Sequence, residues 1–222
     1  MGAILYLDTI LVPLSLFLTI GYHALLWHNF KNKPFLTTFG MLAQRRREWL
    51  RGMQQGDDKM GMLAVQSLRN TLMATILTST VSILLTLSLA ALTNSTYTAT
   101  HLFTNSIFGS QSSKILAVKY GSASVFSSVS FLCSSIALGC LVDSSFLINN
   151  ESGDRFSSQG YTERMVERGF VLAVVGNRVL CITFSLLLWL FGPVPVVVGS
   201  VGLVWGLYEL DFAGKLSKVW KN

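Results

Sequence analysis

The residues of this sequence best suited to chemistry are an adjacent amide and guanidinium, Asn177 and Arg178, inside the apolar run "VVGNRVLCITFSLLLWLFGPVP". An arginine near the centre of a bilayer costs about 2.5–3.5 kcal/mol on insertion scales, so it usually faces the interior of a helix bundle or water. Counted from a span that enters the membrane near residue 170, Arg178 lies ~12 Å along the helix axis. A permanent cation at that depth could attract an anion.

Polar residues at the matching depth of other predicted spans could complete a layer around this cation. They are one imidazole and several hydroxyls: Thr19, His23, Thr78, Ser79, Ser134 and Ser135. An anion-attracting constriction in a channel would have such a composition. A structural interpretation competes with this one, because an arginine side chain can also reach toward the cytoplasmic interface and bind a lipid phosphate.

Two predicted spans are rich in hydroxyl side chains. The first carries Thr71, Thr75, Thr78, Ser82 and Thr86 on one helical face, and the second carries Ser124, Ser127, Ser128, Ser130, Ser134 and Ser135. Hydroxyl stripes of this kind could line a water-filled path with neutral donors and acceptors. Alternatively, the hydroxyls bond to carbonyls of their own helix, and their small size lets helices approach closely. We favour the second interpretation.

Membrane-spanning helices must position these residues. Of the 222 residues, 51% are apolar and only 13% are charged, which is too apolar for an ordinary soluble domain. Crossing a hydrocarbon core of ~30 Å takes about 20 helical residues. The sequence therefore predicts an all-α, integral membrane helical bundle that forms a single domain over 1–222, with four long transmembrane helices and a short fifth helix. The predicted spans are about 4–28, 71–92, 120–142, 170–191 and 194–210.

The Gly-Pro-Val-Pro sequence at 192–195 predicts a break between the last two helices. One straight helix over 171–208 would be ~57 Å long, nearly twice the hydrocarbon thickness. Pro193 and Pro195 remove backbone donors and clash with the preceding turn. We expect the chain to turn back there and return Lys215, Lys218 and Lys221 to the basic side, rather than run along the outer interface.

The connection over 29–70 predicts the orientation of the chain in the membrane. It holds eight of the 17 basic residues against three acidic ones; the basic residues are Lys31, Lys33, Arg45, Arg46, Arg47, Arg51, Lys59 and Arg69. Short basic loops prefer the cytoplasmic side. The amino terminus should then lie outside, and a glycan on Asn150 would invert this orientation.

Part of the same connection reads as a basic, amphipathic helix that leads into the second span. Its arginines, Arg45, Arg46, Arg47 and Arg51, lie beside Trp49 and suit anionic lipid at the cytoplasmic leaflet. Nucleic-acid binding is not expected, because this arginine run lies between two membrane spans and no recognition fold surrounds it.

Sequence signatures of enzymes are not found. The chain has no "GxxxxGK[ST]", "GxSxG" or "HExxH" motif, and no Cys/His cluster with metal-ligand spacing. Cys133, Cys140 and Cys181 fall inside apolar spans and are expected to be reduced and packed. We therefore expect no enzymatic activity, cofactor or metal.

Several stretches resemble a known family. The segments "VQSLRNTLMATILTSTVSILL", "KILAVKYGSASVFSSVSFLCSSIALGCLV" and "FSLLLWLFGPVPVVV", the last after "YTERMVERGF", are similar to the plant branch of multi-pass membrane proteins described as domain of unknown function 599. The resemblance covers roughly 5–210, and "LRNTLM" and "LLLWLFGPVP" are its most specific parts. It implies an integral membrane fold and a plant origin, and it supplies no catalytic or ligand-binding residues.

Two functional hypotheses follow from these patterns. The first is a homo-oligomeric ion channel or transport protein with a polar layer around Arg178, since a small chain with few spans needs several copies to enclose a pore. The second is a membrane scaffold or regulatory subunit that acts through its basic cytoplasmic loop. In either case the protein would lie in the plasma membrane or an endomembrane.

Overall fold

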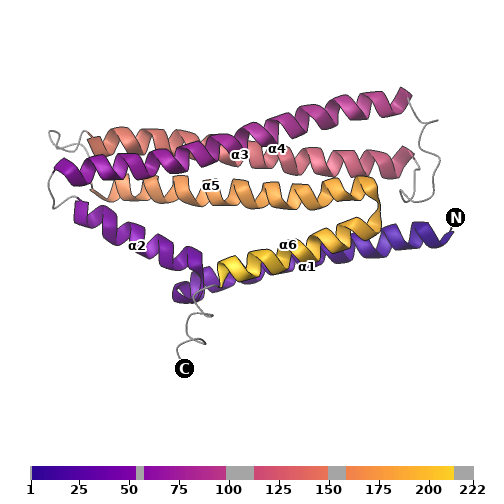
Figure 1. Ribbon diagram of the computed structural model, residues 1–222, viewed down its shortest axis with the longest axis horizontal. Helices are drawn as coiled ribbons and strands as arrows, with labels where there is room; N and C mark the ends of the chain where they lie inside the picture. Colours follow the sequence, from indigo (N-terminus) through magenta and orange to yellow (C-terminus); the bar gives the residue numbers. More distant parts are fainter. Residues whose placement is uncertain (1, 54–57, 99–112, 150–158, 213–222) are drawn as a thin grey trace. The chain divides into compact units, whose positions relative to one another are not determined.

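The computed structural model describes residues 2–53, 58–98, 113–149 and 159–212, and within these ranges the chain is helical and has no strands (Figure 1). The elements are α1 (Gly2–Asn32), η1 (Pro34–Leu36), α2 (Thr38–Met53), α3 (Asp58–Thr98), α4 (Ser113–Asn149), α5 (Gln159–Leu188), η3 (Trp189–Phe191) and α6 (Pro193–Asp211). Among the described residues, five helices are long and apolar enough to cross a membrane: Ile10–Asn32, Val65–Thr93, Ile115–Ile148, Gly160–Phe191 and Pro193–Asp211. The predicted all-α membrane fold is confirmed.

The basic connection predicted over 29–70 is largely helical. Helix α1 continues to Asn32, α2 occupies Thr38–Met53, and α3 already begins at Asp58. The helix predicted inside this connection is therefore present. Helix α3 begins well before the predicted span at 71, because residues 58–70 contain no proline and mostly good helix formers that continue the helix beyond its apolar part.

The chain divides into two compact units. Unit 1 contains the described residues of Met1–Leu42, Thr86–Phe126 and Cys181–Asn222, and unit 2 contains those of Ala43–Leu85 and Ser127–Leu180. Helices α2, α3, α4 and α5 each contribute to both units.

Helices α1 and α6 lie side by side and run in the same direction in unit 1 (Figure 1). Val12 in the first half of α1 shares a buried cluster with Val196 near the start of α6. Toward the other end, Tyr22 and Leu26 of α1 form a second buried cluster with Phe212, which follows α6. The chain therefore returns after its break, as the sequence predicts. Lys215, Lys218 and Lys221 lie outside the described residues, and so does Asn150.

The break lies at the predicted glycine. Helix α5 tightens into η3 over Trp189–Phe191, and Gly192 then adopts φ 131° and ψ 173°. This backbone conformation is essentially restricted to glycine. Pro193 starts α6, where its missing N–H costs nothing because the first N–H groups of a helix have no intrahelical partner.

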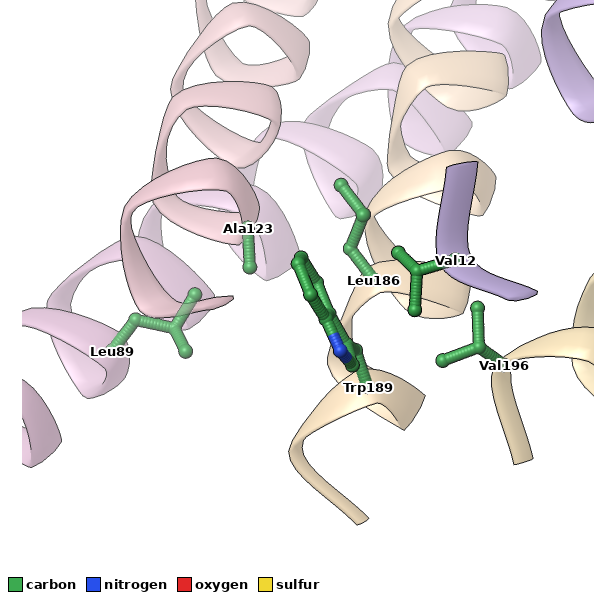
Figure 2. Close-up of a cluster of buried hydrophobic side chains, with 6 residues drawn as sticks. All are labelled: Val12, Leu89, Ala123, Leu186, Trp189 and Val196. Atoms are coloured by element: carbon green, nitrogen blue, oxygen red, sulfur yellow. The ribbon is translucent and has the colours of Figure 1, made fainter. Parts of the chain in front are cut away.

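A buried cluster of apolar residues surrounds this break in unit 1. It consists of Val12, Leu89, Ala123, Leu186, Trp189 and Val196. Figure 2 shows the indole of Trp189 in the middle of the cluster, among side chains that come from five helices. Helix α6 also packs closely on the end of α5, since a Cβ on Gly199 would lie 2.2 Å from Cδ1 of Leu188.

Unit 2 contains a separate apolar cluster that fixes α2. Leu50 of α2 is buried together with Leu68 of α3, Leu141 of α4 and Val166 of α5. Trp49 and Phe170 pack against this cluster. Helix α2 is thus docked on three other helices through its apolar side.

Candidate functional site

Helices α4 and α5 approach each other closely just before Asn177 and Arg178. The hydroxyl of Ser130 on α4 donates a hydrogen bond to the carbonyl oxygen of Gly176 on α5 over 2.7 Å. A Cβ on Gly176 would lie 2.4 Å from Oγ of Ser134 and 3.3 Å from the carbonyl oxygen of Ser130. A Cβ here would require the Ser134 side chain to turn away and the backbone of α4 to move by a few tenths of an ångström.

Hydroxyls extend the same contact to α3. The Oγ atoms of Ser82 and Ser130 lie 2.8 Å apart, and Ser127 Oγ donates to the carbonyl oxygen of Ser82 over 2.7 Å. Ser82 and Ser130 have one hydroxyl proton each, and each also has a carbonyl acceptor, Thr78 for Ser82 and Gly176 for Ser130. A bond between the two Oγ atoms therefore forms only when one hydroxyl turns away from its carbonyl. A chain of buried hydrogen bonds therefore joins α3, α4 and α5 inside unit 2.

Three threonines of the α3 stripe bond to their own helix. Thr71, Thr75 and Thr78 donate to the carbonyl oxygens four residues earlier, over 3.5, 2.8 and 3.1 Å. Each such bond uses the single hydroxyl proton within the helix. Together with the interhelical bonds of Ser82, Ser127 and Ser130, they support the packing interpretation of the two hydroxyl stripes.

The predicted polar layer is divided between the two units. Unit 2 holds Thr78, Ser79, Ser134, Ser135, Asn177 and Arg178, whereas unit 1 holds Thr19 and His23. In unit 2, Ser79 and Ser134 are buried, Arg178 is half-buried and Asn177 is exposed. Among the described residues, Ser134 Oγ has no hydrogen-bond partner. A single layer of all eight residues stays a prediction.

The side chains of Thr19 and His23 form hydrogen bonds with backbone carbonyls of their own helix, α1. Thr19 Oγ1 donates to the carbonyl oxygen of Ser15 over 2.9 Å, and His23 Nδ1 lies 2.8 Å from the carbonyl oxygen of Thr19. Because a carbonyl oxygen only accepts, Nδ1 is the donor in this contact. The ring also packs edge-on against Tyr22, with centroids 5.4 Å apart.

Of the four arginines predicted to contact lipid, two have partners on α5. The guanidinium of Arg46 lies over the ring of Phe170, 3.9 Å from its centroid, and burial lowers the pKa of Arg46. Arg47 donates to Glu167, and this hydrogen bond raises the pKa of Arg47. Arg45 is exposed. The side chain of Arg51 lies outside the described residues.

The sequence patterns did not single out two further arginines, both on α5. Arg164 and Arg168 are exposed in the first turns of α5, beside the carboxylates that face α2. Their i, i+4 spacing at the start of an apolar span indicates that the two arginines are neighbours on one helix face. The acidic residues in the same segment make its overall charge look balanced, so the pattern does not stand out in the sequence.

Unit 1 contains buried polar groups that the sequence patterns also did not single out. The hydroxyl of Tyr22 donates to a carboxylate oxygen of the buried Asp211 over 2.5 Å. Thr38 Oγ1 lies 2.8 Å from the carbonyl oxygen of Leu210 and 3.2 Å from that of Asp211. Thr38 thus caps the carboxyl end of α6, whose last carbonyls have no intrahelical partner. Lys119 is also buried, with Nζ 5.7 Å from the ring centroid of Trp189.

Comparisons with known proteins identify the family. The family model described as Protein of unknown function, DUF599 matches residues 10–216. A search of curated proteins found no match, and neither did a search of solved structures. The plant origin that the resemblance implies stays a prediction. Because the match extends over almost all of the five-helix membrane fold described above, the chain belongs to the DUF599 family of proteins of unknown function.

Proposed function

We propose that this multi-pass membrane protein is a membrane scaffold or regulatory subunit that acts from the cytoplasmic face, where helix α2 binds anionic lipid. The observation that carries the proposal is the docking of α2. The proposal assigns the protein no enzymatic activity and no cofactor. It is compatible with either the plasma membrane or an endomembrane.

The contacts of α2 support a lasting role for this basic helix. Leu50 is buried among three other helices, while Arg46 and Arg47 contact α5. A connection that only linked two spans would not need such contacts. They hold the helix in a fixed position, and a preorganised surface loses less conformational entropy when it binds a partner.

The charges of this region favour an anionic partner. Arg45 is exposed on α2, and Arg69 is exposed on α3. The cytoplasmic leaflet carries a negative surface potential, to which each nearby basic residue adds about 1 kcal/mol of attraction. Positive-inside orientation would place α2 at that leaflet.

The test compares lipid binding by the full chain in nanodiscs with and without phosphatidic acid. The variant Arg45→Gln/Arg51→Gln removes two charges of α2 and leaves the contacts of Arg46 and Arg47 with α5 intact. The variant Lys31→Gln/Lys33→Gln removes two charges outside α2 and serves as the matched control. We expect native mass spectrometry to show fewer retained phosphatidic acid molecules for the α2 variant alone. Equal retention by all three proteins would contradict the proposal.

The second candidate function is the homo-oligomeric ion channel or transport protein. A specific observation favours keeping it: Asn177 is exposed on an apolar membrane helix, directly before the half-buried Arg178. An amide in hydrocarbon needs a hydrogen-bond partner, which a neighbouring copy of the chain could provide. Against this candidate, Thr71, Thr75 and Thr78 of the α3 stripe donate to carbonyl oxygens of their own helix.

Ion flux through protein in liposomes tests the second candidate. Wild type and Arg178→Ala are compared at matched insertion and oligomer size. A channel predicts that the substitution changes the rate or the anion preference of the flux. If neither protein conducts under voltage, pH and calcium steps, or if crosslinking shows a strict monomer, the channel is excluded and the scaffold remains.

A further inference from the structure

We propose that α5 carries a separate binding site for the phosphate headgroup of an anionic phospholipid, formed by Tyr161, Arg164 and Arg168. These residues follow the spacing i, i+3, i+7, which places them on one face of the helix. All three are exposed, and Tyr161 retains 53% of its accessible surface. The inference rests on the proposed function in one respect: the proposed orientation places the amino-terminal end of α5 at the cytoplasmic leaflet.

The acidic residues of the same segment are directed elsewhere. Glu167 pairs with Arg47 of α2, and the charge of Glu163 also contributes to raising the pKa of Arg47. Glu167 therefore faces α2, and Glu163 lies close enough to Arg47 for its charge to act there. Within the described part of the chain, Arg164 and Arg168 form no ion pair. Their two charges are thus available to a ligand from outside.

The spacing of the two guanidinium groups suits a phosphate. Residues at i and i+4 are neighbours on a helix surface, with Cβ atoms about 5–6 Å apart. A guanidinium can donate two parallel hydrogen bonds to one phosphate, so two arginines at this distance can hold a single headgroup from both sides. Tyr161 lies one turn before Arg164, where an aromatic ring with a hydroxyl suits the boundary between lipid and water.

The continuation of this face identifies the source of the phosphate as a lipid. The candidate span runs from Gly160 to Phe191, so Arg164 and Arg168 lie ~6 and ~12 Å from its start along the axis. One and two turns further on, the same face carries Leu172 and Val175, which are partly exposed and apolar. Along this face, the cationic arginines are followed by an apolar surface. A phospholipid can use both, with its phosphate on the arginines and its acyl chains on the apolar surface, whereas a free phosphate would use the arginines alone.

The experiment measures phosphatidic acid binding to the full chain in nanodiscs by native mass spectrometry. The test variant is Arg164→Gln/Arg168→Gln, and the matched control is Lys31→Gln/Lys33→Gln, which removes the same charge from another exposed basic pair. We expect binding to weaken about tenfold or more in the test variant and to stay near wild type in the control. The variant Arg164→Lys/Arg168→Lys keeps the charge but loses bidentate donation, so we expect an intermediate loss. Size-exclusion profiles verify that each variant folds.

The outcomes separate this inference from the proposed function. If Arg45→Gln/Arg51→Gln loses binding and the α5 variant does not, the α5 site is wrong and the role of α2 stands. If only the α5 variant loses binding, the site is supported and the role of α2 is overturned. An equal loss in the lysine control would show that general surface charge is responsible, which overturns the site. Displacement of the lipid by inorganic phosphate at equal concentration would also overturn the assignment to a lipid.

Discussion

The hydroxyl of Ser130 donates to the backbone carbonyl oxygen of Gly176 over 2.7 Å and so joins α4 to α5. The bond is possible because Gly176 has no side chain, which lets the two backbones come close. The helix continues directly into Asn177 and Arg178. The position of these two polar residues in the membrane therefore depends on a contact between small residues.

Gly176→Ala should weaken this contact. The added Cβ would lie 2.4 Å from Ser134 Oγ and 3.2 Å from Ser134 N, so the serine side chain must rotate and the α4 backbone must move by a few tenths of an ångström. Overpacking of this kind costs about 1–3 kcal/mol. The measurement is the free energy of unfolding in mixed micelles. Gly139→Ala, which meets no atom within 4 Å, is the control and should be neutral or slightly stabilising. Equal stabilities of the two variants would contradict the close approach.

The sequence alone predicts much of the fold, because membrane spans are long apolar runs and a glycine followed by two prolines marks a break. The return of the chain at Gly192 follows from such local signals. The basic helix α2 could be anticipated for the same reason, since its arginines and apolar residues repeat with a helical period.

The contacts between distant residues could not be predicted in this way. Tyr22 and Asp211 are 189 residues apart in the chain, and Arg47 and Glu167 are 120 apart. Periodicity shows which face of a helix is apolar, but it does not show which other helix covers that face. For the same reason, Thr19 and His23 could be matched in depth with Arg178 without any indication that they belong to another unit.

Gly192→Ala should destabilise the turn between α5 and α6. Gly192 has φ 131° and ψ 173°, a conformation that costs an alanine about 1–3 kcal/mol. We expect a lower melting temperature in detergent, measured by fluorescence-detected size exclusion. Gly202→Ala on α6 adds a methyl group where nothing lies within 4 Å and should leave the melting temperature close to wild type. A Gly192→Ala protein as stable as this control would show that the turn can adopt another conformation.

Tyr22→Phe should loosen the carboxyl end of α6 from α1. The substitution removes the hydroxyl that donates to the buried Asp211 and leaves a carboxylate oxygen without that donor. Loss of one partner of a buried hydrogen bond costs about 1–3 kcal/mol. Tyr208→Phe removes a hydroxyl from a half-exposed tyrosine and is the matched control. A double-mutant cycle with Asp211→Asn measures the coupling, and a coupling near zero would show that the bond does not stabilise the pair.

The docking of α2 should depend on Leu50 more than on the ion pair of Arg47. Leu50 is buried in an apolar cluster, and its truncation to alanine should cost about 2–5 kcal/mol. Arg47 and Glu167 retain 49% and 33% of their side-chain exposure, and pairs at the surface contribute only about 0–1 kcal/mol. Hydrogen exchange of the α2 amides should therefore accelerate far more in Leu50→Ala than in Arg47→Gln. The opposite order would mean that charge holds the helix.

The ion pair itself should be insensitive to alkaline pH. The hydrogen bond to Glu167 raises the pKa of Arg47 from an ordinary value that already lies far above neutrality. A base with a raised pKa in the folded state keeps its full stabilising effect below its unfolded pKa and loses it only as the pH rises through the folded value. The coupling between Arg47→Gln and Glu167→Gln in a double-mutant cycle should thus be equal at about pH 7 and about pH 10. A coupling that disappears between these two pH values would contradict this prediction. It would show that the interaction of Arg47 with Glu167 depends on a group that titrates in this interval, which a guanidinium does not.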